Sequence, residues 1–99
     1  MKIEKEKKYI VRSAQAGVFY GNIAEKNGDE VDMENVRRLW YWDGACSLSE
    51  LATHGVTAPE NCKFTVNVPS MTILGVCEII KCTEKACRII DEVREWKRS

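Results

Sequence analysis

The dipeptide Asn27-Gly28 constrains the fold of this chain most, because it separates two runs that alternate in the manner of β-strands. Both central residues of a type I′ turn need a positive φ angle, which asparagine and glycine adopt more readily than other residues. Residues 18–26 and 30–42 are therefore expected to form an antiparallel hairpin. Glu34-Asn35 interrupts the second run, which predicts either a bulge or a short turn at that point.

Three further runs have the composition of strands, at residues 8–12, 64–68 and 71–81. Pro69-Ser70 is predicted to form the turn between the last two runs. Residues 71–81 are apolar on both sides in places, so this run is predicted to be a central strand of the sheet.

Two helices are expected. Ser47-Leu48-Ser49-Glu50 has the spacing of a capping box and begins a short helix, which Gly55 is suited to end. Thr83 is predicted to cap a second helix that extends towards the C-terminus. The apolar stripe of that helix consists of Ala86, Ile89, Ile90, Val93 and Trp96. The predicted fold class is α+β, with a small antiparallel sheet of about five strands, one short helix and one C-terminal amphipathic helix.

Length and charge limit what the protein can be. Its 99 residues are expected to form a single domain, residues 1–99, which an oligomer would stabilise. Fifteen basic and fifteen acidic side chains cancel, which argues against a dedicated binder of duplex DNA. The first residues mix both charges and lack an apolar stretch, so neither a signal peptide nor a transit peptide is expected. No segment of the sequence is long and apolar enough to be expected to span a membrane. We therefore expect a cytoplasmic protein.

The five cysteines and the one histidine do not have the pattern of a metal centre. Cys77, Cys82 and Cys87 follow one another with four residues between each pair, whereas structural zinc sites favour closer pairs. His54 has no second histidine with which to share an ion. The cysteines are expected to be reduced thiols, because their number is odd and no secretion signal is present. No metal and no cofactor is expected.

The motifs of several enzyme classes are missing from the sequence. It lacks the G-x-S-x-G nucleophile elbow, the P-loop and the G-x-G-x-x-G fingerprint. Gly17 and Gly21 fit a bend and a close backbone approach better than a phosphate cradle. Asp43 precedes a glycine at the end of a strand, where an aspartate usually serves the turn. The protein is therefore not expected to be an enzyme.

Binding chemistry is concentrated in the run Arg37-Arg38-Leu39-Trp40-Tyr41-Trp42-Asp43-Gly44-Ala45, which holds three of the eight aromatic residues and two adjacent arginines. In a regular strand, Arg38, Trp40 and Trp42 share one face. A purine base can stack on an indole ring, and a phosphate can accept hydrogen bonds from a guanidinium group. The alternative is that both indoles pack beneath the closing helix while Arg38 extends its charged end into water.

A second group of basic residues lies near the C-terminus and consists of Arg88, Arg94, Lys97 and Arg98. Arg94 and Arg98 are four residues apart and are expected to share one face of the closing helix. These residues either form a solvated face that complements the helix dipole or contribute to a ligand site across a subunit interface.

Several segments stand in the order and spacing of a family of phage proteins. They are Val11-Arg12, Ala16-Gly17-Val18-Phe19, the run from Arg37 to Ala45, Ser47-Leu48-Ser49, and Ala58-Pro59-Glu60-Asn61-Cys62-Lys63-Phe64. Over most of residues 7–90 the chain resembles the first-described Thoeris anti-defence family, the nucleotide "sponge" proteins. The resemblance implies that the protein binds and hides signalling nucleotides of bacterial immune enzymes without cleaving them.

The same resemblance implies the ligands, the assembly and the place of action. The principal ligands would be cyclic ADP-ribose isomers, which TIR-domain enzymes make from NAD. The resemblance also implies cyclic dinucleotides or trinucleotides as further ligands, which some members of the family bind at separate sites. Family members form dimers, and several form hexamers built from dimers, with ligand sites between subunits. The protein would act in the cytoplasm of the infected bacterial host.

Chemistry and rough family position together indicate six ligand-binding residues. The candidates for stacking are Phe19, Trp40 and Trp42, and the candidates for phosphate contacts are Arg37, Arg38 and Arg94. Two other hypotheses stay open. One is a nucleic-acid or protein-binding accessory module whose contact face is the aromatic run, and the other is an enzyme that hydrolyses a nucleotide signal.

Overall fold

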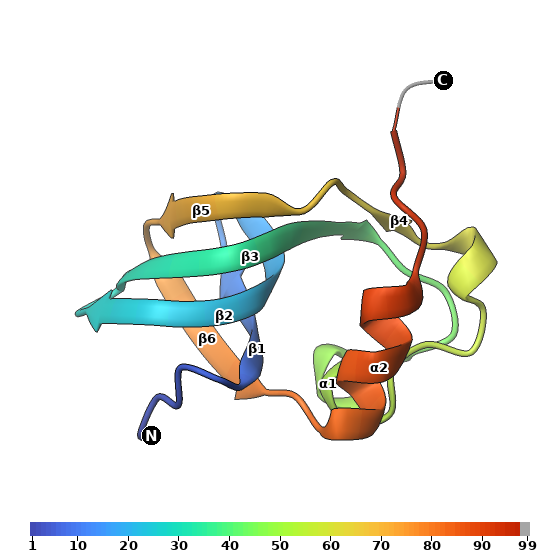
Figure 1. The fold of residues 1–99 in the computed structure, drawn as a ribbon, viewed down its shortest axis with the longest axis horizontal. Helices are drawn as coiled ribbons and strands as arrows, with labels where there is room; N and C mark the ends of the chain where they lie inside the picture. The colour runs from blue at the N-terminus through green and yellow to red at the C-terminus, as the bar shows by residue number, and fades with distance from the viewer. Residues whose placement is uncertain (98–99) are drawn as a thin grey trace.

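The computed structural model describes residues 1–97, which form six strands, two α-helices and one turn of 3₁₀ helix (Figure 1). In chain order the elements are β1 (Lys8–Ser13), β2 (Gly17–Asn27), β3 (Glu30–Tyr41), α1 (Leu48–His54), the 3₁₀ turn (Pro59–Asn61), β4 (Lys63–Phe64), β5 (Val68–Ile73), β6 (Val76–Lys81) and α2 (Glu84–Glu92). The predicted α+β class is confirmed, with one strand more than expected.

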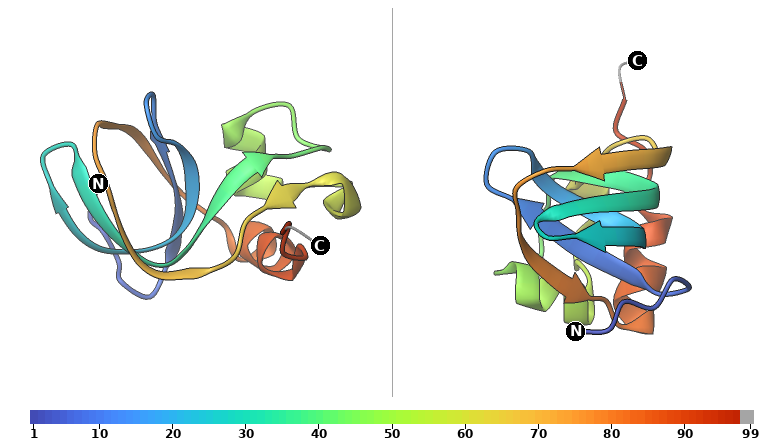
Figure 2. Two further views of the ribbon diagram at one scale, coloured as in Figure 1. Left: turned by 90° about the horizontal axis from the view of Figure 1, so that it is seen from above. Right: turned by 90° about the vertical axis from the view of Figure 1, so that its left-hand side faces the viewer.

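The strands pair antiparallel in the order β4-β3-β2-β1-β6, and β5 also pairs with β3. β5 and β6 lie at opposite edges of this sheet, yet the chain connects them directly at Leu74-Gly75. The sheet therefore curls round into an open barrel, and both helices lie outside it (Figure 2).

The predicted hairpin joins β2 and β3, but its turn lies one residue further along the chain. Asn27 pairs with Glu30, so the loop consists of Gly28 and Asp29. Gly28 has a φ angle of 62°. Asp29 has no positive φ angle, so the loop fits a type II′ turn, in which only the first central residue needs one, rather than the type I′ turn predicted.

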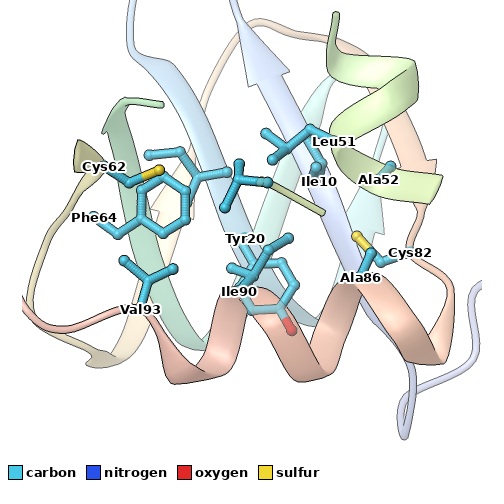
Figure 3. Packing of buried hydrophobic residues seen from close by; sticks show 12 residues of the cluster. Ile10, Tyr20, Leu51, Ala52, Cys62, Phe64, Cys82, Ala86, Ile90 and Val93 are labelled. Atoms are coloured by element: carbon cyan, nitrogen blue, oxygen red, sulfur yellow. The ribbon is translucent and has the colours of Figure 1, made fainter. Parts of the chain in front are cut away.

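Alternation along the strands divides the core into two clusters on opposite faces of the sheet. The inner cluster fills the inside of the barrel and consists of Tyr9, Val11, Phe19, Ile23, Val31, Met33, Val36 and Ile73. The helix-side cluster lies between the sheet and the helices and includes Ile10, Tyr20, Leu51, Phe64 and Ile90 (Figure 3). Consecutive residues of one strand, such as Phe19 and Tyr20, thus belong to different clusters.

A bulge bends β3 at Asn35, which is the one non-glycine residue among those described with a positive φ angle, 50°. The pairing of β2 with β3 shifts register between Tyr20 and Asn22, opposite this point. Gly21 lies there, and a Cβ atom added to it would meet the carbonyl oxygen of Asn35 at 2.8 Å. Of the two predicted alternatives the structure has the bulge, and Gly21 permits the close approach expected of it.

Three predictions for the later strands are wrong. Pro69-Ser70 lies within β5, and the turn is instead at Leu74-Gly75, where Gly75 has a φ angle of 67°. An edge strand such as β5 tolerates proline, because one side of its backbone has no partner strand. Residues 71–81 are therefore not one central strand, and β6 forms the opposite edge. The expected strand at residues 64–68 is likewise divided between β4 and β5.

Both helices begin where the sequence predicts. Ser47 Oγ accepts a hydrogen bond from the N–H group of Glu50, and Thr83 Oγ1 accepts one from Ala86, each at 3.1 Å. Gly55 ends α1 with a φ angle of 76°. Among the helices of residues 1–97, none has the length and apolar character needed to cross a membrane.

α2 is shorter than predicted, because the chain leaves the helix after Glu92. The following C-terminal segment, residues 93–97, runs beside β4, and the N–H group of Trp96 donates to the carbonyl oxygen of Phe64 at 2.8 Å. Trp96 therefore does not belong to the helical stripe. Arg94 also lies beyond the helix, and Arg98, which was predicted to share a helix face with it, lies outside the described residues.

Candidate functional site

Arg37 is buried, and its guanidinium group joins two distant parts of the chain. Nε donates to the carbonyl oxygen of Thr65 (3.1 Å) and Nη2 to that of Phe64 (3.2 Å), beside β4. Nη1 donates to the carbonyl oxygens of Ile90 and Val93, both at 3.0 Å, at the end of α2. Burial lowers the pKa of Arg37, although an arginine remains charged in proteins.

These contacts correct the prediction that Arg37 binds phosphate. A guanidinium group has five N–H donors, and backbone carbonyl groups of this chain accept four hydrogen bonds from it. Arg37 is therefore a structural residue that fixes the C-terminal end of α2 against β4.

Arg38 lies on the opposite face of β3, with its guanidinium carbon 4.8 Å from the centre of the Phe19 ring. Phe19 is 1% exposed and belongs to the inner cluster, so its ring is not free to stack on a base as predicted. It supports the guanidinium group through a cation–π contact instead. The Nε atom of Arg38 is buried without a hydrogen-bond partner, and no hydrogen bond found among residues 1–97 uses the terminal N–H groups, which remain available to another molecule.

Trp40 and Trp96 form an exposed pair that we call the tryptophan stack. Their ring centres are 6.4 Å apart and their planes differ by 3°. Trp40 is 63% exposed and Trp96 is 46% exposed. Leu39 belongs to the helix-side cluster, so its neighbours Arg38 and Trp40 share the other face of β3, as predicted. Sequence reasoning missed Trp96, because the helical spacing that assigned it to the buried stripe ends with α2 at Glu92.

Trp42 does not join Trp40, contrary to the prediction. The pairing of β3 with β4 shifts register between Leu39 and Tyr41, and β3 ends at Tyr41. Trp42 is partly buried and packs against the helix-side cluster. Strict alternation holds only along a regular strand, and the irregular end of β3 turns Trp42 away.

Two basic residues near the tryptophan stack have different surroundings. Lys63 Nζ lies 5.4 Å from the centre of the Trp96 ring, a contact that the sequence did not indicate. Arg94 is exposed and lines a cleft of about 440 Å³ together with Trp96. Three carboxylates line the same cleft, those of Glu60, Glu92 and Glu95. They repel a phosphate, so the surroundings do not favour the predicted phosphate contact of Arg94.

Comparison with known proteins gives a family that has no assigned function. A family model described as a domain of unknown function (DUF6948) matches residues 6–90. The chain belongs to the DUF6948 family. The matched residues include Arg38 and Trp40 and end before Trp96. Neither a curated protein nor a solved structure matches the chain.

The buried thiols of this DUF6948 domain are poor nucleophiles. Cys82 lies in the helix-side cluster, and burial raises the pKa of its thiol to about 12. Burial also raises the pKa of Cys62. Among residues 1–97, no three side chains of histidine, cysteine, aspartate or glutamate are grouped to hold a metal ion. The tryptophan stack and Arg38 offer ring faces and hydrogen-bond donors, which are groups that bind a ligand.

Proposed function

We propose that this DUF6948 protein binds a signalling nucleotide and sequesters it without cleaving it. The observation that carries the proposal is the tryptophan stack, in which two indole rings are parallel and exposed. Large aromatic side chains are usually well buried, and an exposed group of them is typical of a binding surface.

A nucleotide suits the groups around the tryptophan stack. Stacking of a base on an aromatic side chain contributes about 1–3 kcal/mol per base. Arg38 lies on the same face of β3 as Trp40 and has an unpartnered donor, and Lys63 adds a positive charge beside Trp96. A ligand that carries both a base and a phosphate engages the ring faces and the cations together.

The resemblance to Thoeris anti-defence sponge proteins supports a narrower proposal for the ligand. Cyclic ADP-ribose isomers are the principal ligands in this proposal, with cyclic dinucleotides or trinucleotides as further ligands. The protein would hold them in the cytoplasm of the infected host, away from the immune effector that they activate. No covalent step is required of any residue.

Sequestration also calls for an enclosed site. A sub-micromolar dissociation constant needs more than about 8 kcal/mol of binding free energy, which an open surface does not supply. We therefore propose a homo-oligomer, either a dimer or a hexamer built from dimers, in which a second copy closes over the tryptophan stack. Val66, which is 51% exposed, adds to the apolar surface available for such an interface.

A nucleic-acid or protein-binding accessory module is the second candidate. The same exposed side chains favour it, because single-stranded nucleic acids and protein partners also cover exposed aromatic residues. This candidate predicts no uptake of a cyclic ADP-ribose isomer, so ligand uptake distinguishes it from the sponge.

The test is to mix the protein with a cyclic ADP-ribose isomer, remove unbound ligand by gel filtration, and heat-denature the complex. Chromatography and mass spectrometry then identify the molecule that is released. A sponge releases the isomer unchanged in stoichiometric amount, whereas protein denatured before mixing retains none. Release of a hydrolysed product would show an enzyme, and absence of uptake would refute sequestration of this ligand.

A further inference from the structure

We infer that a cleft beside Arg38 binds a phosphate group of the nucleotide whose base stacks on Trp40, an inference that rests on the function proposed above. This Arg38 cleft has a volume of about 340 Å³ and lies between the β1–β2 turn and the end of β5. Phe19, Arg38, Thr72 and Leu74 are among its lining residues.

The guanidinium group of Arg38 has donors available for an acceptor in this cleft. Arg38 lines the cleft, and none of the side-chain hydrogen bonds found among residues 1–97 uses its guanidinium group. Its Nε atom is itself buried, so the terminal N–H groups are the donors that an acceptor in the cleft can reach. The Phe19 ring, fixed in the inner cluster, holds the guanidinium group from one side at 4.8 Å. The donors are therefore positioned before a ligand arrives, which reduces the entropy lost on binding.

The charge of the Arg38 cleft favours an anion. Arg38 is the only residue in its lining with an ionisable side chain, and none of the ion pairs found among residues 1–97 involves it. Asp32 accepts a hydrogen bond from Thr72 Oγ1 at 2.6 Å and is engaged with that hydroxyl group. Three carboxylates surround Arg94 in its own cleft, so Arg38 is the better place for a phosphate.

The spacing of the two side chains matches the construction of a nucleotide. Arg38 and Trp40 are two residues apart on one face of β3, which separates them by about 7 Å along the strand. A ribose joins base and phosphate across a gap of this order. The inferred ligand class is therefore a nucleoside phosphate, including the pyrophosphate of a cyclic nucleotide, rather than a free base or a nucleoside.

Isothermal titration calorimetry with adenosine, ADP and inorganic pyrophosphate tests the cleft separately from the tryptophan stack. The wild-type protein is expected to bind ADP about 10-fold or more tightly than adenosine, because charge-assisted hydrogen bonds from Arg38 reach only the phosphates. Arg38→Gln should remove this difference and leave adenosine binding unchanged. Arg88→Gln, an exposed arginine of α2, serves as the matched control and should bind as the wild type does.

A second variant tests the cleft without altering Arg38. Leu74 lines the cleft and is 63% exposed, so Leu74→Glu places a carboxylate beside the guanidinium group without disturbing the core. This variant should weaken ADP and pyrophosphate binding about 10-fold, while Leu74→Gln changes neither. Circular dichroism and urea unfolding verify that each variant is folded.

The outcomes distinguish failure of the phosphate cleft from failure of base stacking. Equal loss of adenosine and ADP binding in Arg38→Gln, or unchanged ADP binding in both charge variants, would overturn the phosphate cleft and leave the tryptophan stack intact. Pyrophosphate binding that requires Arg38, in a protein that binds no adenosine, would support the cleft and refute base stacking. Failure of the wild-type protein to bind any of the three probes would overturn both.

Discussion

Arg37 and Arg38 are adjacent and chemically identical, yet the structure gives them opposite roles. Alternation along β3 places them on different faces of the sheet. Arg37 meets four backbone carbonyl oxygens, and Arg38 meets a ring face and an open cleft. The sequence predicts that the faces differ, but it cannot show which face meets carbonyl groups, because these come from residues far along the chain.

The structural role of Arg37 predicts a large loss of stability in Arg37→Lys. A lysine ammonium is a point donor and cannot reach the carbonyl groups at both ends of the guanidinium group. We expect the free energy of unfolding in urea to fall by about 2–4 kcal/mol, because several buried acceptors lose their partner. Arg88→Lys on the exposed face of α2 is the control and should change it by less than about 0.5 kcal/mol. Equal unfolding midpoints for the two variants would contradict the role assigned to Arg37.

Among the elements, the sequence predicts those parts that depend on near neighbours. The caps at Ser47 and Thr83 are confirmed, because each hydroxyl group bonds an N–H group three residues later. The hairpin at Asn27-Gly28 is confirmed to within one residue. The end of α2 was not predictable, because the competing hydrogen bond of Trp96 is to Phe64, a residue distant in sequence.

The start of α1 also makes a prediction about pH. The Glu50 carboxylate accepts a hydrogen bond from the N–H group of Cys46, which lowers its pKa below the usual 4.5. A carboxyl group with a lowered pKa in the folded state stabilises the protein above its unfolded pKa and loses that contribution as pH falls through the folded value. Wild-type protein should therefore melt at a higher temperature than Glu50→Gln at about pH 7.

The same difference in melting temperature should shrink at about pH 3, where the Glu50 carboxyl group is increasingly protonated. Thermal unfolding followed by circular dichroism measures it at both pH values. A difference that stays constant with pH would contradict the role of the ionised carboxylate.

The whole molecule brings together groups that no single element holds. The inner cluster fixes Phe19 under Arg38, while Arg37 and the helix-side cluster fix the segment that carries Trp96. Sequence alone predicted the shared face of Arg38 and Trp40, because alternation within one strand is local. It predicted Trp42, and not Trp96, as the partner of Trp40. The spacing of residues indicates neither the irregular end of β3 nor the early end of α2.

The central claim is that the tryptophan stack holds the base of a nucleotide. The most direct measurement is calorimetric titration of a cyclic ADP-ribose isomer into the wild-type protein, Trp40→Ala and Tyr41→Ala. Both side chains are exposed neighbours on β3, so neither substitution removes core packing. We expect Trp40→Ala to weaken binding about 10-fold or more and Tyr41→Ala to bind as the wild type does. Equal affinity of Trp40→Ala and wild-type protein would contradict the claim.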